Sequence, residues 1–192
     1  MIEYKRYRWF YTSSGKLVIG GKNAEQNDQL LKETMQNKKK YYVMHTSHPG
    51  SPFSLIIGDI NEISPEDLEE CAIFTGCFSR AWKDGEKETK IHIFTTTQLF
   101  KDEKMKAGTW GIVGKPEERK VKLELVLTNQ SSVLRAVPEK SANKVFLKIR
   151  PGKKDKTLMV DKLKEKLKIE VTSEEILSAL PSGGVEIIGK SS

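Results

Sequence analysis

The chain has 192 residues and a formal net charge of +7 at pH 7, and 37% of its residues are hydrophobic and 31% charged. This size and composition are typical of one globular domain, alone or with a small appendage, that folds without disulfide or metal support. No apolar run reaches the roughly 20 residues of a membrane-spanning helix, and the N-terminus lacks the apolar segment of a secretory signal. We therefore expect a cytoplasmic protein with no membrane contact.

The first 115 residues predict short strands interrupted by two helices. The strand-like segments are residues 7–11, 17–19, 41–45, 53–58, 90–95 and 108–114. Asn23 is the expected cap of a helix that ends near Gln36. Ser64, followed by Pro65 and two acids, starts a second, amphipathic helix that ends near Lys83.

The pattern changes near residues 115–119. Beyond them, residues 121–127, 133–137, 144–149 and 185–188 predict strands, and residues 155–167 and 173–180 predict helices. The whole pattern predicts an α+β fold, with a mixed, mostly antiparallel sheet flanked by helices and a small C-terminal α+β extension packed on it. The predicted division is into residues 1–120 and 121–192.

Basic residues gather in two blocks, residues 1–40 and 101–168, which are separated by an acidic block. Such blocks favour a polyanionic partner, because counterions released from phosphate chains drive binding. A lysine-rich surface that is merely solvated fits the charge pattern as well.

Gly20 and Gly21 interrupt a predicted strand, and Lys22 and Asn23 lead into the first helix. Glycines let a backbone approach a ligand closely, and a helix N-terminus offers free N–H donors to a phosphate. The pattern is neither a Walker loop nor a dinucleotide-binding fingerprint. It fits a phosphate-binding loop and a purely structural turn equally.

Charged and aromatic residues alternate in the first predicted strand. The alternation places Trp9 and Tyr11 on one face and Arg8 and Phe10 on the other. An exposed ring here could stack on a splayed base. Burial in the core is the commoner fate of a ring such as Trp9.

His45, His48 and Ser51 surround a Pro-Gly turn. Two histidines three residues apart could belong to a metal site, but no suitable third ligand is near in sequence, so we expect no metal and no cofactor. A histidine that is hydrogen-bonded or contacts a base is favoured over one that performs acid–base chemistry.

The end of the second helix and the tail add further cations. Ser79 and Lys83 could contact a phosphate beside the Gly-Gly loop, although a cation at this position also suits the helix dipole. Lys153 and Lys154 begin a lysine-rich strip that extends to Lys168. This strip fits a solvated face or an auxiliary polyanion contact.

In this order, the segments resemble the RNA-binding domain of the NFACT family (NFACT-R), known chiefly from ribosome-quality-control factors. The resemblance covers about residues 5–125, and the tail is similar, more loosely, to the segment after this domain in archaeal members. The residues that carry it are Arg8-Trp9-Phe10, Ser13-Ser14-Gly15, Ile19-Gly20-Gly21-Lys22-Asn23-Ala24, Gln26-Asn27, His45 before Pro49-Gly50-Ser51, the helix from Leu68 to Ser79, and residues 108–114.

The resemblance implies a non-catalytic α+β module that binds tRNA or ribosomal RNA, with the ribosome as a further partner. The full-length factors carry additional domains that this chain lacks, so extension of stalled nascent chains is not implied. The residues expected to contact RNA are Arg8, Trp9, Ser14, Gly20, Gly21, Lys22, Asn23, Asn27, His45, Ser51, Ser79, Lys83, Lys153 and Lys154.

Two other functions fit parts of the sequence. An RNA-processing or RNA-modifying enzyme, or its RNA-recruiting subunit, could use His45 and His48 with Asp59 or Glu62. The sequence contains no set of nucleophile, base and orienting group that would complete such a site. A protein-interaction adaptor could instead dock a basic ribosomal protein on the acidic middle block.

Overall fold

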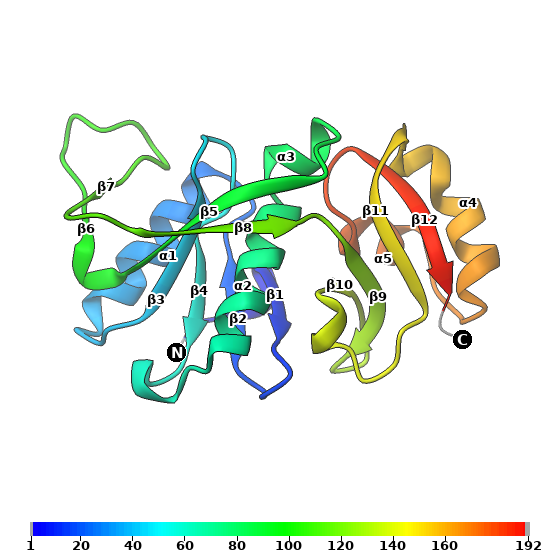
Figure 1. Cartoon of the computed structure of the whole chain (residues 1–192), viewed down its shortest axis with the longest axis horizontal. Helices are drawn as coiled ribbons and strands as arrows, with labels where there is room; N and C mark the ends of the chain where they lie inside the picture. Colours follow the sequence, from blue (N-terminus) through cyan, green and yellow to red (C-terminus); the bar gives the residue numbers. More distant parts are fainter. Residues whose placement is uncertain (1, 191–192) are drawn as a thin grey trace.

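The structure is a computed structural model that describes residues 2–190 (Figure 1). Its main sheet has six strands in the order β1–β2–β4–β3–β5–β8, and every neighbouring pair is antiparallel. These strands are β1 (Arg8–Tyr11), β2 (Leu17–Gly20), β3 (Tyr42–Thr46), β4 (Ser54–Ile57), β5 (Glu88–Thr95) and β8 (Glu117–Lys122). The predicted α+β class is confirmed.

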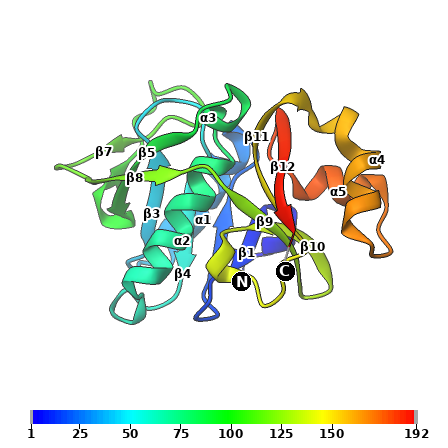
Figure 2. The ribbon, with the colours of Figure 1, turned by 45° about the vertical axis from the view of Figure 1, so that its right-hand side comes forward.

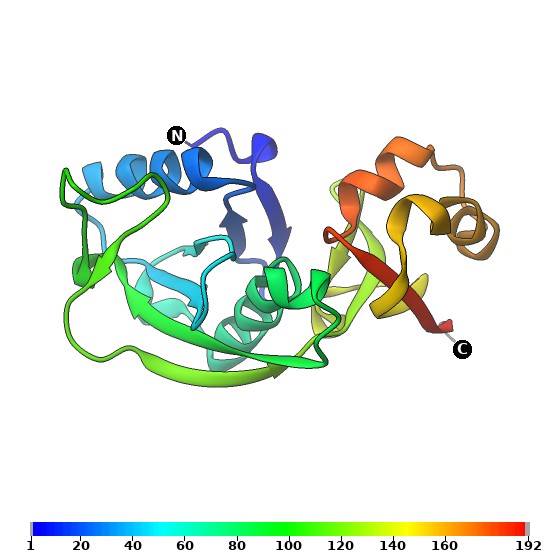
Figure 3. The same ribbon diagram turned by 90° about the horizontal axis from the view of Figure 1, so that it is seen from above.

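Two helices cover the two faces of this sheet, α1 (Ala24–Gln36) on one side and α2 (Pro65–Cys77) on the other (Figure 3). Neighbouring residues of one strand enter different cores: Val18 packs on the α2 side with Phe74, and Ile19 packs on the α1 side. This alternation follows from the two-residue period of a strand. Both helices have the predicted caps, because Asn23 accepts a hydrogen bond from the Gln26 amide and Ser64 from the Asp67 amide.

Beyond β8 the chain forms a second, antiparallel sheet in the order β10–β9–β11–β12 (Figure 2). Its elements are β9 (Leu125–Gln130), β10 (Val133–Val137), β11 (Leu147–Asp155), α4 (Lys156–Leu167), α5 (Ser173–Ala179) and β12 (Gly184–Lys190). In Figure 1 this part lies beside the main sheet, with α4 at the far side. The chain changes sheet between Lys122 and Leu125; a division into two domains at residue 120 stays a prediction.

The remaining elements are short. They are α3 (Arg80–Lys83), the ribbon of β6 (Leu99–Phe100) and β7 (Gly111–Ile112), and 3-10 turns at Tyr4–Arg6, Ile60–Glu62, Thr96–Gln98 and Glu139–Ser141. Within residues 2–190, every helix is too short or too polar to cross a bilayer.

Four predicted elements differ from the structure. The strand expected over residues 144–149 is β11, which spans Leu147–Asp155. The helix expected over residues 64–83 breaks at Phe78, because the Ser79 hydroxyl bonds the Gly76 carbonyl and caps the separate helix α3. Only Gly111–Ile112 of the expected strand 108–114 is paired. The expected strand 121–127 is interrupted between Lys122 and Leu125, where the chain passes from one sheet to the other.

A side-chain amide joins the two sheets at the edge strand β1. Gln130 accepts a hydrogen bond from the Tyr11 amide at 2.8 Å and donates one to the Tyr11 carbonyl at 2.9 Å. The same amide nitrogen donates to the Ser141 carbonyl, and the Ser141 hydroxyl donates to the buried Glu70 carboxylate. These bonds satisfy backbone groups that an open sheet edge would leave exposed.

Candidate nucleic-acid interface

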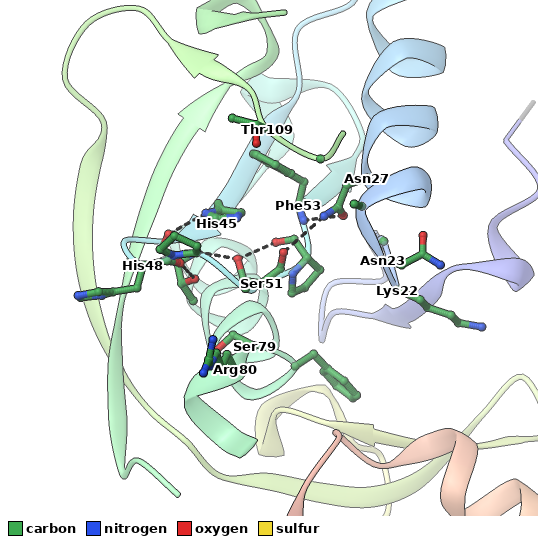
Figure 4. A pocket seen from close by; sticks show the side chains of 18 of the residues that line it. Lys22, Asn23, Asn27, His45, His48, Ser51, Phe53, Ser79, Arg80 and Thr109 are labelled. Atoms are coloured by element: carbon green, nitrogen blue, oxygen red, sulfur yellow. Dashed lines mark hydrogen bonds between the residues drawn. The ribbon is translucent and has the colours of Figure 1, made fainter. Parts of the chain in front are cut away.

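Loops from one edge of the main sheet surround a hollow of about 640 Å³, which we call the first hollow (Figure 4). Its wall comprises the loop from β2 to α1, the 47–52 turn, the start of α3 and residues 107–110. These segments meet because β2 and β3 both end at this edge, where Met44 and Gly20 flank Ser54. The predicted site residues in its wall are Arg8, Gly21, Lys22, Asn23, Asn27, His45, Ser51, Ser79 and Lys83.

The Gly-Gly-Lys-Asn loop combines a structural turn with exposed polar groups. A Cβ on Gly21 would lie 2.1 Å from the Asn27 Oδ1, so the loop requires glycine there for packing. Asn23 caps α1, and its neighbour Lys22 has an exposed side chain. The loop therefore needs no ligand to explain its glycine, while Lys22 is free to contact one.

Asn27 and Ser51 line the first hollow but are occupied in holding its wall together. The buried Asn27 accepts a hydrogen bond from the Phe53 amide at 3.0 Å and donates to the Ser51 carbonyl at 3.4 Å. The Ser51 hydroxyl accepts from the Thr46 amide and donates to the Pro52 carbonyl. Both residues position the 47–52 turn, so we expect neither to be a main contact with a ligand.

His45 stacks on Phe53 in the wall of the first hollow, with ring centroids 4.5 Å apart. Burial lowers the pKa of His45 and nearby His92 adds to this effect, although a hydrogen bond with the Thr46 carbonyl opposes it. His45 is therefore neutral at pH 7. Because its Nδ1 donates to that carbonyl at 2.7 Å, the neutral tautomer keeps Nε2 as an acceptor.

One side of the first hollow is formed by α3 (Figure 4). The Arg80 amide bonds the Gly50 carbonyl at 2.7 Å, which fixes α3 to the 47–52 turn. Ser79 is buried as the cap of α3 and has no free hydroxyl group. The Arg80 side chain is exposed and pairs with Asp84 at 3.4 Å, and Lys83 is also exposed.

A loop held by the partly buried carboxylate of Asp28 closes another side of the first hollow. Asp28 accepts hydrogen bonds from Lys101 at 3.2 Å and from the Trp110 indole at 2.8 Å. Burial alone would raise the pKa of Asp28, but these bonds and one from the Gly108 amide hold it below its usual value. Gly108 has φ +76° and packs so closely on Ala24 that a Cβ would clash. The loop is thereby fixed on the start of α1.

A second hollow, of about 980 Å³, lies on the other side of Lys83, which lines both. Lys153 and Lys154 line this second hollow, far from the glycine loop in the chain. Its wall also contains Glu186, which pairs with Arg150 at 2.9 Å. Its charge is therefore mixed, unlike that of the first hollow.

Three predicted contact residues lie away from both hollows. Trp9 is only 2% exposed, between the Tyr4 ring and the Arg135 guanidinium, so its ring cannot stack on a base. Ser14 lies at the opposite end of β2, where its hydroxyl donates to Asp67 at 2.6 Å. Gly20 is a buried strand residue, tightly packed against Pro52.

Sequence reasoning missed several wall residues. His92 lines the first hollow because β5 pairs with β3 and sets it opposite His45, a pairing that no local pattern reveals. Thr109 and Trp110 reach the first hollow from a segment that was expected to be a strand. Arg135, which lies outside both hollows and over the Trp9 ring, was also missed, although a single cation within the apolar strand 133–137 was a visible signal.

The groups proposed for an enzyme are not assembled. His45 and His48 line the first hollow, but Asp59 and Glu62 follow the far end of β4. There Glu62 pairs with Lys16 at 3.2 Å. Within residues 2–190, no group of three His, Cys, Asp or Glu side chains could hold a metal ion.

Comparisons with known proteins agree with this architecture. The chain is 34% identical to the archaeal Rqc2 homolog aRqcH of Methanocaldococcus jannaschii, across 97% of this chain and 29% of that protein. It is 31% identical to the ribosome quality control complex subunit NEMF homolog of Drosophila melanogaster, across 58% of this chain and 12% of that protein. The chain thus spans less than a third of the length of these relatives.

A solved structure shares the fold. It is the C-terminal part of the fibronectin/fibrinogen-binding protein from Streptococcus suis, which matches with a TM-score of 0.51 and 20% identity over 60% of this chain and 44% of that chain. Residues 6–114 match the family described as the NFACT protein RNA binding domain. They make up more than half of the chain and include every wall residue of the first hollow except Ser182. The chain therefore belongs to the family of NFACT RNA-binding domains.

Proposed function

We propose that the first hollow is an RNA-binding site and that its ligand is tRNA or ribosomal RNA. The observation that carries this proposal is the charge of the wall. Four basic side chains and all three histidines of the chain line the first hollow, and no described Asp or Glu does. Acids are abundant elsewhere, with 26 Asp and Glu in the sequence, so this one-sided wall suits a polyanion.

The roles of the wall residues follow from which groups are free. Lys22, Arg8 and Lys83 supply cations for backbone phosphates, and the Asn23 side chain supplies a further polar group at the rim. The uncharged His45 ring, which is held against the buried Phe53, offers one acceptor nitrogen, which suits a base edge. Lys153 and Lys154 extend the contact along the second hollow.

The names of the relatives support a place in ribosome quality control, as an RNA-binding part of a larger assembly. The protein would act without catalysis, by holding tRNA or ribosomal RNA on or near the ribosome. Fluorescence anisotropy with a tRNA and with a ribosomal RNA hairpin of similar length, each competed by the other, would decide between the two.

Substituting Lys22 tests the site itself. We expect Lys22→Ala to weaken RNA binding about 3- to 10-fold at low salt and to reduce the salt slope by about one. Lys164→Ala is the matched control, because Lys164 is exposed on α4 and lines neither hollow. Wild-type affinity that does not change between low and high salt, or equal effects of the two variants, would contradict the proposal.

A further inference from the structure

Two arginines meet where the edges of the two sheets come together. Arg8 on β1 lies over the Phe78 ring, with its guanidinium carbon 4.7 Å from the ring centroid. Arg135 on β10 lies over the Trp9 ring at 4.5 Å. Both line one small depression together with Ser178 of α5. The aromatic rings hold the two guanidinium groups in place.

Arg8 and Arg135 differ from the other arginines of the chain in having no ion-pair partner within residues 2–190. The other four arginines each pair with a carboxylate: Arg6 with Glu33, Arg80 with Asp84, Arg119 with Glu69 and Glu117, and Arg150 with Glu186. Within residues 2–190, neither Arg8 nor Arg135 forms an ion pair or a side-chain hydrogen bond, and the Arg135 Nε is buried without a partner. Two half-buried guanidinium groups are thus left unpaired, although burial makes an unpaired charge costly in free energy.

The two cations also affect each other and their neighbours. Burial and the charge of Arg135 lower the pKa of Arg8 to about 10. Burial, Arg8 and Arg135 together lower the pKa of Lys22. All three remain charged at pH 7, so the junction concentrates like charges at a cost in free energy. A bound anion would remove that cost, and a guanidinium edge matches the oxygens of a phosphate.

We propose that Arg8 and Arg135 together bind one phosphodiester group of the RNA backbone at the junction of the two sheets. This inference rests on the proposed RNA binding and extends it. It makes the second sheet part of the binding site, although Arg135 lies outside the family match at residues 6–114. The RNA would pass from the first hollow, over Lys22 and Arg8, to β10.

RNA affinity of Arg8→Gln, Arg135→Gln and the double variant tests the inference. Each single change should weaken binding about 5- to 10-fold and lower the salt slope by about one, and the double variant should bind nearly as well as either single variant, because the two residues share one phosphate. Arg119→Gln is the matched control, since Arg119 lies outside both hollows and should change affinity less than about twofold.

The outcomes separate this inference from the proposed function. If Arg8→Gln weakens binding and Arg135→Gln does not, the RNA site stands and the shared phosphate is overturned. Effects that multiply in the double variant would place the two residues on separate phosphates and would also overturn it. If no variant in the first hollow or at the junction changes RNA binding, both proposals fail.

Thermal unfolding without RNA distinguishes a binding role from a structural one. Removing one of two repelling cations should leave the melting temperature of Arg135→Gln unchanged or higher. A large loss of stability, with unchanged RNA affinity of the folded protein, would assign Arg135 a purely structural contact with Trp9. Arg135→Lys keeps the positive charge but loses the planar guanidinium. If Arg135→Gln does not fold, weaker RNA binding by Arg135→Lys than by the wild type tests the binding role instead.

Discussion

The two ends of strand β1 bury charge in opposite ways. Just beyond Tyr11, the carboxylates of Asp67 and Glu70 accept hydrogen bonds from the hydroxyl and amide groups of Thr12, Ser13, Ser14, Ser64 and Ser141. At the other end, Arg8 faces Arg135 with no described acid beside either. A buried charge with a complete set of hydrogen bonds is structural, whereas one whose donors are unused is prepared for a ligand.

The largest effect is expected from removing a buried carboxylate at the Tyr11 end of β1. Glu70→Ala leaves three donor groups, on Ser13 and Ser141, without their acceptor, and should lower the free energy of unfolding by about 3 kcal/mol. Urea unfolding measures this, with Glu66→Ala on the exposed side of the same helix as control. RNA affinity of the folded variant should equal that of the wild type. Weakened RNA binding would contradict the separation of the two ends.

The second largest effect is expected from adding a carboxylate beside Arg8 and Arg135, so that the arginine end of β1 also has its charges paired. Ser178 is exposed beside Arg8 and Arg135, so Ser178→Glu would supply the missing carboxylate. We expect RNA affinity to fall at least about tenfold, or about 1.4 kcal/mol, and the melting temperature to rise. Asn143→Glu makes the same charge change away from both hollows and should alter neither. Unchanged RNA binding by Ser178→Glu would show that the arginine pair lies off the RNA path.

The smallest effect is a pH dependence at the carboxylate end. Burial alone would raise the pKa of Asp67, but hydrogen bonds from Ser14, Thr12 and Ser64 hold it below its usual value. The ionised Asp67 contributes fully to the free energy of unfolding above its unfolded-state pKa of about 3.9. This contribution is lost as the pH falls through the lower folded-state pKa. We therefore expect Asp67→Asn to lower the free energy of unfolding by about 1 kcal/mol at pH 7. This difference from the wild type should narrow below about pH 4. Melting temperatures from pH 7 to pH 3 test this, and a gap that widens in acid would contradict it.

Local sequence signals predicted much of this architecture. The Asn23 and Ser64 caps and the succession of strands and helices along the chain follow from short-range patterns. The strand order within each sheet, which brings the Gly-Gly loop and the Pro-Gly turn together, was not predicted. The break at Ser79 was missed because an apolar helical spacing continues across it. Burial was the expected fate of the Trp9 ring, but its contact with Arg135, more than a hundred residues away, could not be predicted from any local pattern. Arg8 and Arg135 are as far apart in the sequence, so their proximity could not be predicted either.

The Gln130 amide that joins β1 to the second sheet has a consequence for binding kinetics. It occupies both backbone groups of Tyr11, so it holds Arg8 and Arg135 at a fixed separation before any RNA arrives. The entropy of ordering the two halves of the junction is therefore lost during folding and not during association. Such preorganisation lets the phosphate contact form in a single encounter, without a prior closing motion of one sheet on the other.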